Sequence, residues 1–165
     1  MTNTRTGIGY DVHRFSEDRP LILGGVTVPF EKGLAGHSDA DVLLHAIMDA
    51  LLGAAALGDI GIHFPPGDDR FFNASSLTLL ADVASMLISN SYQVVNIDST
   101  LIVEAPRISP HTPKMRATIA DVLNIQSSQV NIKATTNEGM GFIGRSEGIA
   151  ALSICTLVGS AGEKT

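Results

Sequence analysis

The sequence predicts an α+β protein, a two-layer sandwich in which the helices lie on one face of a β-sheet. Segments of strand character and of helical periodicity are mixed along the chain, with long gaps between the strands. The length of 165 residues suits a single domain that spans residues 1–165. Because helices then cover only one face of the sheet, we expect another copy of the chain to cover the other face.

Strands are expected in several parts of the chain that are rich in β-branched or apolar residues. Residues 21–23 and 26–28 flank the pair Gly24-Gly25 and therefore predict a hairpin. The continuous apolar run 149–158 predicts a strand that is buried on both sides. The remaining strands are expected at residues 7–13, 92–104 and 130–134.

The first helix is expected within residues 36–61. Ser38 is its predicted N-cap because Asp41 follows three residues later, as in a capping box. Gly58 is expected to end the helix in a left-handed turn. A stripe of apolar side chains predicts that one side of this helix is buried: Leu44, Ile47, Met48 and Leu51.

Two further helices are expected after it. The second is expected to be capped by Ser75 or Ser76, and its core stripe is expected to comprise Leu77, Leu80, Val83, Ala84, Leu87 and Ile88. The third begins at Thr112-Pro113, where proline suits the first helical position, and its apolar positions are Met115, Ile119, Val122 and Leu123. Loops are expected at 31–37, at 59–73 as a candidate flap, and at the glycine-rich segment 139–148.

Charge and composition exclude several classes of function. The chain has 17 acidic and 11 basic residues and a formal net charge of −6, which opposes binding to nucleic acid or an anionic membrane. Hydrophobic residues make up 44% of the chain, but no apolar run reaches the roughly 18 residues that a membrane span requires. We therefore expect a soluble protein that binds neither nucleic acid nor membranes.

The only cysteine, Cys155, lies in the last apolar run and is expected in the core. One cysteine cannot form an intramolecular disulfide, so a reducing compartment fits best. The N-terminus lacks the apolar segment of a secretory signal. We therefore expect a cytoplasmic bacterial protein, with a processed organellar protein as the alternative.

Acidic and imidazole side chains recur at spacings that suggest a metal site. Asp11 and His13 are two residues apart in a predicted strand, so they point to the same face, while Asp41, His45 and Asp49 recur every four residues on one helix face. Asp11, His13 and His45 together offer one carboxylate and two imidazoles, which leaves an open position on a tetrahedral zinc ion, as in catalytic sites. For Asp41 and Asp49, a solvated helix face and a hydrogen-bonding role beside His45 both stay open.

Two other functions are compatible with this pattern. Two imidazoles and one carboxylate also bind iron in non-haem Fe(II) oxygenases, although the predicted helices argue against the all-β barrel of those enzymes. A non-catalytic trimeric sensor of the same fold would bind a nucleotide without turning it over. Metal analysis would identify the first alternative, and a turnover assay the second.

Several short motifs follow one another along the chain: Gly9-Tyr-Asp-Val-His-Arg-Phe15, His37-Ser-Asp-Ala-Asp41 with His45, Gly58-Asp-Ile-Gly61, Ala105-Pro106, and Lys133-Ala-Thr-Thr-Asn-Glu138 with Gly144-Arg-Ser-Glu-Gly148. In this order they resemble the 2-C-methyl-D-erythritol 2,4-cyclodiphosphate synthase family of non-mevalonate isoprenoid biosynthesis. The resemblance implies a homotrimer of ferredoxin-like subunits, with active sites between neighbouring subunits and with one zinc and one magnesium or manganese ion per site. The implied reaction is the cyclisation of 4-diphosphocytidyl-2-C-methyl-D-erythritol 2-phosphate with release of CMP.

The resemblance also implies roles for individual residues. Asp11, His13 and His45 would bind zinc, Glu138 would bind the second metal, and His37 and Thr136 would stabilise the transition state. The methylerythritol phosphate end would contact Ser38, Asp59, Ile60 and Gly61, and would be covered by Phe64, Pro65, Pro66, Gly67 and Asp68; many relatives have Asp in place of Pro66. The cytidine would contact the next subunit's Val103, Glu104, Ala105, Pro106, Arg107, Ile108, Ser109, Ala134, Thr135, Thr136 and Asn137. Phe142 and Arg145 would lie near the trimer axis, where relatives contact an isoprenoid diphosphate or another anion.

Overall fold

A five-stranded sheet forms one layer of the fold in the computed structural model, which describes residues 2–160. Its strands lie in the order β4-β1-β7-β5-β6, with bounds Gly33–Leu34 (β4), Thr2–Ser16 (β1), Gly148–Ser160 (β7), Tyr92–Ile102 (β5) and Val130–Thr135 (β6). Neighbouring strands are antiparallel except β5 and β6, which are parallel. The central pairing of β1 with β7 is long and in register, with Asp11 opposite Ala151 and His13 opposite Ile149.

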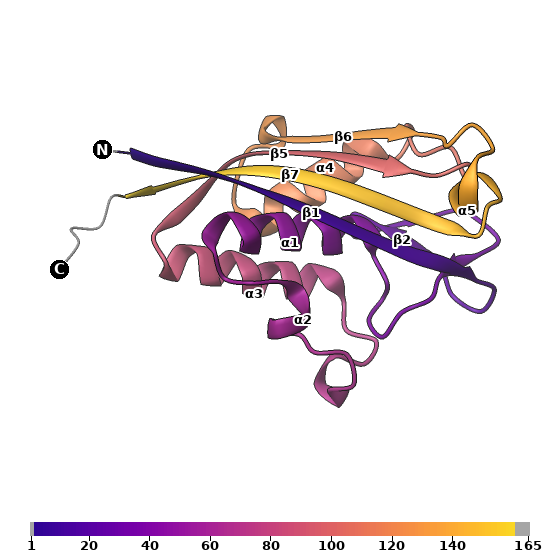
Figure 1. Ribbon diagram of the computed structural model, residues 1–165, viewed down its shortest axis with the longest axis horizontal. Coiled ribbons are helices and arrows are strands. Elements are labelled where there is room, and N and C mark those ends of the chain that lie inside the picture. The colour runs from indigo at the N-terminus through magenta and orange to yellow at the C-terminus, as the bar shows by residue number, and fades with distance from the viewer. Residues whose placement is uncertain (1, 161–165) are drawn as a thin grey trace.

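Three helices form the second layer: α1 (Val42–Ala55), α3 (Ser76–Ser89) and α4 (Thr112–Leu123). Figure 1 shows them together on one side of the sheet, with α1 directly behind the long strand β1. A separate hairpin of β2 (Leu21–Leu23) and β3 (Val26–Val28) lies beside this layer. The expected α+β class, with helices on one face of a sheet, is therefore confirmed.

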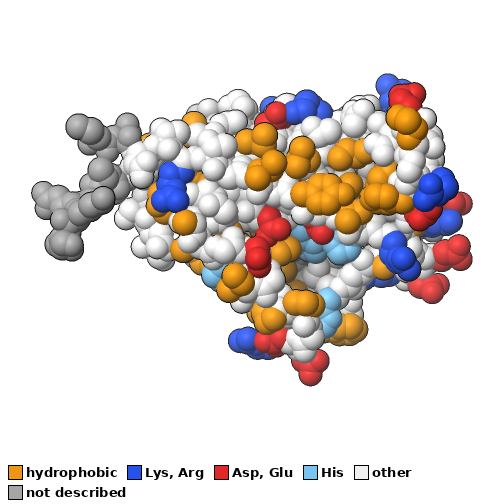
Figure 2. Space-filling model, viewed as in Figure 1, with side chains coloured by type: hydrophobic (Ala, Val, Ile, Leu, Met, Phe, Trp, Pro, Cys, Tyr) orange, Lys and Arg blue, Asp and Glu red, His pale blue; other side chains and the backbone are white. Residues whose placement is uncertain are grey.

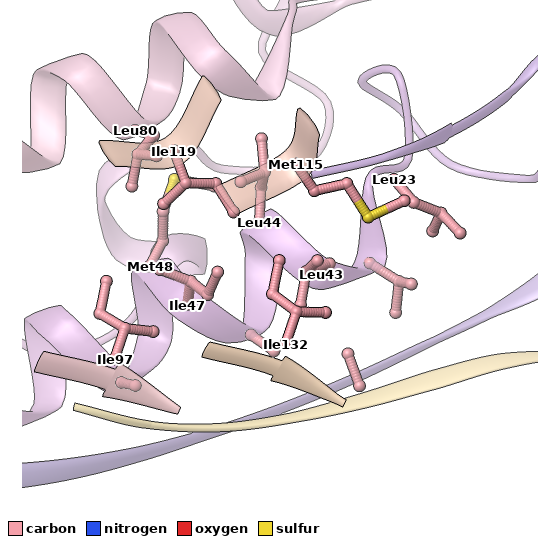
Figure 3. Close-up of a cluster of buried hydrophobic side chains, with 14 of the residues drawn as sticks. Leu23, Leu43, Leu44, Ile47, Met48, Leu80, Ile97, Met115, Ile119 and Ile132 are labelled. Carbon is pink, nitrogen blue, oxygen red and sulfur yellow. The ribbon is translucent and has the colours of Figure 1, made fainter. Parts of the chain in front are cut away.

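The core lies between the two layers, and α1 is its centre. Figure 3 shows Leu43, Leu44, Ile47 and Met48 of this helix between Ile97 and Ile132 of the sheet on one side and Leu80, Met115 and Ile119 of the other helices on the opposite side. Cys155 is buried as expected, and its Sγ lies 3.0 Å from the Ala50 carbonyl oxygen. No helix within residues 2–160 is long and apolar enough to cross a membrane.

The other face of the sheet is open in the single chain. Hydrophobic side chains gather there over β1 and β7 in Figure 2, and they belong to Ile8, Tyr10, Val12, Leu152 and Ile154. The expectation that residues 149–158 are buried on both sides is therefore wrong for the isolated chain. The reason is the strand's period of two: Ser153, Cys155 and Leu157 face the helices, while the residues between them face outward.

Both predicted ends of the first helix are wrong. Asp41, not Ser38, is the N-cap of α1, because its side chain accepts the Leu44 N–H. The helix ends at Ala55, before Gly58: Ala56 takes the left-handed conformation, with φ of 59°, and its N–H donates to the Gly53 carbonyl. Alanine tolerates this conformation here because the Leu57 N–H also donates back, to Leu52, and satisfies a second terminal carbonyl.

Smaller differences concern the second helix and the predicted loops. Ile88 is not in the core but 74% exposed, because the buried face of α3 follows Leu79, Leu80, Val83 and Leu87. The strand expected at 92–104 ends at Ile102. The expected loops contain short regular pieces: β4, α2 (Ile60–His63), η1 (Asp69–Phe71) and α5 (Gly141–Gly144), and a further single turn, η2 (Ser127–Gln129), precedes β6.

Candidate active site

The strand β1 presents Asp11 and His13 to α1. Both side chains point to the helix layer, on the same face as Gly7 and Gly9. Because these two glycines lack side chains, the backbone of α1 lies directly against the strand. His45, one turn into the helix, is thereby brought beside Asp11 and His13.

Asp11, His13 and His45, which we call the triad, converge on one point. Asp11 Oδ2 lies 2.9 Å from His13 Nε2 and 2.9 Å from His45 Nδ1, and the two imidazole nitrogens are 3.1 Å apart. These three atoms are close enough to bind a common metal ion. The sequence prediction that these three residues meet is therefore confirmed in its geometry.

The partners of His13 decide which of its nitrogens carries the proton. His13 Nδ1 lies 2.6 Å from the Ala35 carbonyl oxygen. A carbonyl only accepts hydrogen bonds, so Nδ1 is the protonated nitrogen of the neutral ring and Nε2 has a free lone pair. That lone pair and the Asp11 carboxylate both point to the triad centre. His13 Nε2 and the Asp11 carboxylate can therefore both donate electron pairs to a cation at the triad centre, as imidazole and carboxylate ligands do in metal sites.

The pKa values indicate the same preference for positive charge. Burial alone would raise the pKa of Asp11, but hydrogen bonds to His13 and His45 hold it well below its ordinary value. Burial alone would lower the pKa of His13, but the Asp11 carboxylate and the Ala35 carbonyl raise it. Both shifts stabilise a positive charge between the groups, which a proton or a metal cation can supply.

The triad forms one wall of a pocket of about 270 Å³, which we call the triad pocket. Its other lining residues are His37, Ser38, Met48, Ile60, Gly61, Phe64, Pro66, Phe71 and Leu79. The walls are thus largely apolar, with polar groups gathered at the triad. A pocket of this kind can hold a small organic ligand whose polar group faces the triad.

Four other residues that were predicted to contact the same part of the substrate as Ser38 and Gly61 do not line the triad pocket: Asp59, Pro65, Gly67 and Asp68. The Asp59 side chain caps α2 by accepting the Ile62 N–H, so it faces the helix end. Asp68 forms an ion pair with Arg70 at 2.6 Å, while its carbonyl oxygen lies 3.2 Å from His37 Nε2. Pro65 and Gly67 belong to the turn that closes with the Asp68 N–H bonded to the Pro65 carbonyl. This turn links the candidate flap to His37.

Most residues predicted for the cytidine end line a second pocket of about 300 Å³, the strand-end pocket. It is formed where β5 and β6 end, by Val103, Glu104, Pro106, Arg107, Ile108, Ser109, Ala134, Thr135 and Thr136. The peptide bond between Ala105 and Pro106 is cis. The Glu104 carboxylate accepts the Asn137 N–H at 2.8 Å, and Thr136 Oγ1 donates to Glu138 Oε1 at 3.0 Å. The first contact joins the two chain segments at the pocket, and the second lies within the segment that follows β6.

The two pockets share no lining residue. Within one chain, therefore, the residues predicted to bind zinc and those predicted to bind the cytidine line different pockets. Phe142 lies in α5 and is 42% exposed, and Arg145 follows this helix and pairs with Glu147 at 2.7 Å. Neither residue lines one of the two pockets.

Neither interpretation of Asp41 and Asp49 is correct. The buried Asp41 carboxylate accepts the N–H groups of Gly24 and Gly25 as well as that of Leu44, and so joins the hairpin to the start of α1. Asp49 accepts the Ile60 N–H at 2.9 Å and joins α2 to α1. Both carboxylates bind backbone groups, neither facing solvent freely nor bonding to His45.

Several residues at the site have no signal in the sequence. Met48, Phe71 and Leu79 line the triad pocket, but their apolar positions are indistinguishable from core positions. Arg19 donates to the carbonyls of Gly36 and Ser38, on either side of His37. The remaining missed contacts surround His45: Ser76 and Asp39 form a hydrogen-bonded chain behind its ring.

The sequence model of the YgbB family matches residues 4–158. The chain is 60% identical over 154 residues to the 2-C-methyl-D-erythritol 2,4-cyclodiphosphate synthase of Clostridium perfringens. The matched region covers 93% of this chain and 99% of that relative. It is also 60% identical over 158 residues to the synthase of the same name from Alkaliphilus metalliredigens, over 96% of this chain and 99% of the relative.

Solved structures are similar in fold and sequence. The bifunctional IspDF of Campylobacter jejuni superposes with a TM-score of 0.93 and 42% identity over 97% of this chain, which spans 43% of that longer protein. The CDP complex of IspF from Plasmodium falciparum superposes with a TM-score of 0.84 and 32% identity, over 96% of this chain and 97% of that one. The similarity thus covers both candidate pockets.

Proposed function

The chain belongs to the YgbB family, and on that premise we propose how its two pockets carry out the reaction of a 2-C-methyl-D-erythritol 2,4-cyclodiphosphate synthase. The reaction is the attack of the 2-phosphate of 4-diphosphocytidyl-2-C-methyl-D-erythritol 2-phosphate on its own β-phosphorus. It closes a cyclic diphosphate and expels CMP, which makes the enzyme a phosphorus-oxygen lyase of non-mevalonate isoprenoid biosynthesis.

The triad would hold one zinc ion per subunit, and Glu138 would bind a second ion, magnesium or manganese. The convergence of Asp11 Oδ2, His13 Nε2 and His45 Nδ1 in the wall of an apolar pocket is the observation that carries the proposal. Bound metal ions would supply positive charge to the diphosphate, whose attacking and accepting groups are both anionic.

The chain's own residues would fold the substrate and exclude water. Ser38 and the Gly61 backbone would bind the methylerythritol phosphate end, with Asp59 beside them, and the apolar walls would enclose its carbon chain. His37 and Thr136 would donate hydrogen bonds to charge that develops on the phosphoryl oxygens. Because the nucleophile is a phosphate that is already ionised, positioning contributes more than a general base.

The strand-end pocket would bind the cytidine of a substrate whose phosphates reach the neighbouring subunit's triad pocket. Separate pockets within one chain support this sharing. The CDP complex of the relative from Plasmodium falciparum supports a cytidine nucleotide as the ligand. A homotrimer would bring the pockets together and would cover the apolar sheet face of Ile8, Tyr10 and Leu152. Phe142 and Arg145 would then lie near the trimer axis, where an isoprenoid diphosphate or another anion is the expected ligand. The expected location is the bacterial cytoplasm.

A phosphorus NMR time course with the diphosphocytidyl substrate tests the proposal. We expect the substrate resonances to be replaced by those of CMP and a cyclic diphosphate, without entry of heavy oxygen from labelled water. Label at the β-phosphorus would indicate hydrolysis. Binding without turnover would favour the nucleotide sensor, and iron with oxygen uptake would favour the oxygenase.

A further inference from the structure

The ring of His45 has hydrogen-bonding partners on both of its nitrogens. Nδ1 faces the triad, while Nε2 lies 3.1 Å from Ser76 Oγ on the opposite side of the ring. Ser76 is the first residue of α3 and is fully buried, and His45 is 8% exposed. Water therefore has little access to this side of the ring, so the orientation of His45 depends on protein groups.

Asp39 fixes the direction of the Ser76 hydroxyl. Its carboxylate accepts the Ser76 hydroxyl at 2.5 Å through Oδ1 and the Ser76 N–H at 2.9 Å through Oδ2. A carboxylate has no proton to donate, so the Ser76 hydroxyl hydrogen points toward Asp39. Ser76 Oγ then presents only lone pairs to His45.

A lone pair on Ser76 Oγ requires a proton on the nitrogen that faces it. His45 Nε2 can therefore bond to Ser76 Oγ only as the protonated nitrogen, since two lone pairs 3.1 Å apart would repel each other. Ser38 Oγ, at 3.2 Å from the same nitrogen, can accept as well, because it can turn its own hydrogen away. With Nε2 protonated, the lone pair of Nδ1 faces Asp11 Oδ2 at 2.9 Å, and these two atoms attract each other only through a cation between them, a metal ion or a proton.

We propose that Ser76 and Asp39 are positioning residues that fix the tautomer of His45, so that Nδ1 presents its lone pair to a metal ion at the triad. Asp39 orients the hydroxyl, the hydroxyl accepts the Nε2 proton, and the ring is held with Nδ1 toward Asp11 and His13. A carboxylate behind a ligating imidazole also makes the imidazole a stronger electron donor. The inference deepens the proposed function, since it concerns the same metal site.

Zinc affinity tests the inference without substrate. Ser76→Ala removes the hydroxyl and keeps a good helix former, and Ser75→Ala is the matched control, because the exposed Ser75 makes no side-chain capping bond at the adjacent position. We expect the zinc dissociation constant, measured by competition with a chromogenic chelator, to rise about 10- to 100-fold in Ser76→Ala and to change less than about twofold in Ser75→Ala. Asp39→Asn should give a smaller rise that still exceeds the control. Equal affinities for the wild type and Ser76→Ala would overturn the proposal.

The tautomer itself can be observed in the zinc-bound wild-type protein. Long-range nitrogen–proton NMR spectra of histidine-labelled protein distinguish the two neutral forms, and His45→Gln identifies the resonance of this ring. We expect the Nε2-protonated form in the wild type and a mixture in Ser76→Ala. A wild-type ring protonated at Nδ1 would refute the inference, even if the serine variant failed to fold.

The two measurements separate this inference from the proposed function. If the wild-type chain bound no zinc, the proposed metal site would be wrong, and the inference with it. If the wild type bound zinc and catalysed cyclisation but Ser76→Ala bound zinc equally well, only the inference would fail.

Discussion

Gly9 of β1 lies in direct contact with the Ala46 carbonyl group of α1. A Cβ atom at Gly9 would lie only 2.0 Å from the Ala46 oxygen and 2.7 Å from the Ala50 nitrogen. The close approach joins the two elements that provide the triad, since Asp11 and His13 follow Gly9 in the strand and His45 precedes Ala46 in the helix. The distance between strand and helix therefore sets the distance between the metal ligands.

Gly9→Ala should accordingly weaken both the fold and the metal site. The added methyl group meets backbone atoms that cannot rotate away, so the strand and helix must separate. We expect a loss of about 3 kcal/mol in the free energy of unfolding, at the upper end of overpacking effects. Zinc affinity should fall as well, because the triad is spread. Urea unfolding and chelator competition measure the two effects.

Gly53→Ala is the matched control for this prediction. Gly53 lies within α1 and is exposed, and the nearest atom to an added Cβ would be the Ile8 carbonyl oxygen at 3.9 Å. Alanine is the better helix former, so the free energy of unfolding should rise by up to about 1 kcal/mol. If both variants lost stability equally, the contact between Gly9 and Ala46 would not be the cause of the loss.

Much of the fold could be predicted because burial in this chain follows local periodicity. The apolar stripe of α1 from Leu44 to Leu51 and the alternation along β1 arise from neighbouring residues alone. The helix ends could not be predicted in the same way. Asp41 is the N-cap while its carboxylate also accepts N–H groups from Gly24 and Gly25, and the sequence does not indicate that the hairpin lies there.

The metal ligands of the site could be predicted from the sequence, but the residues that hold them in place could not. The spacing of Asp11 and His13 placed them on one face of a strand, and two imidazoles with one carboxylate suggested a common metal. The position of His45 beside Asp11 and His13 depends on the contact between β1 and α1. The partners of its outer nitrogen, Ser76 and Asp39, come from different segments and are ordinary polar residues in sequence. No local pattern distinguishes them from solvated side chains.

The buried Asp41 predicts a dependence of stability on pH. Burial raises the pKa of Asp41 to about 6 from an ordinary 3.8, although the N–H groups of Gly25, Gly24 and Leu44 oppose the shift. The stability that comes from the protonated carboxyl is therefore full below about pH 3.8 and is lost as pH rises through about 6. Relative to Asp41→Asn, the wild type should lose about 2 kcal/mol between pH 4 and pH 7. Urea unfolding of both proteins measures this difference. A difference that stayed constant or grew with pH would mean that the N–H groups keep the carboxylate ionised.

Arg19 should affect turnover more than metal binding. Its guanidinium donates to the Gly36 carbonyl at 2.6 Å and to the Ser38 carbonyl, so it holds the segment that contains His37. Arg19→Gln should lower kcat/KM by about tenfold, which corresponds to the loss of one hydrogen bond to a charged group of about 1.5 kcal/mol. Zinc affinity should stay within about twofold, because Arg19 makes no hydrogen bond to a side chain of the triad. Lys32→Gln, which removes a nearby surface cation, is the control and should leave both quantities unchanged.

His45→Ala should abolish zinc binding without unfolding the chain. The purified wild type should contain about one zinc ion per chain, and two remaining ligands form only a weak site. The core of α1 lies on Leu44, Ile47 and Met48, so the circular dichroism spectrum should be retained. Elemental analysis of gel-filtered protein measures the metal content. Full zinc occupancy in the variant would show that the metal is bound elsewhere.

The separation of the two pockets leads to a prediction about subunit sharing. His13→Ala damages the triad pocket, and Glu138→Ala damages the proposed site of the second metal, beside the strand-end pocket. Each variant should be nearly inactive when pure. After both are unfolded and reassembled in equal amounts, a shared site is intact only if its triad comes from the Glu138 variant and its strand-end pocket from the His13 variant.

Random assortment in closed trimers meets each of these conditions about half of the time, so about a quarter of wild-type activity should return. Native mass spectrometry verifies that mixed trimers have formed, and separately reassembled variants provide the baseline. A complete site within each chain predicts a different result, because every chain in the mixture carries one damaged residue and no complete site would exist. If mixed trimers form and activity stays at the baseline, each chain must use its own two pockets, and the proposed sharing between subunits is wrong.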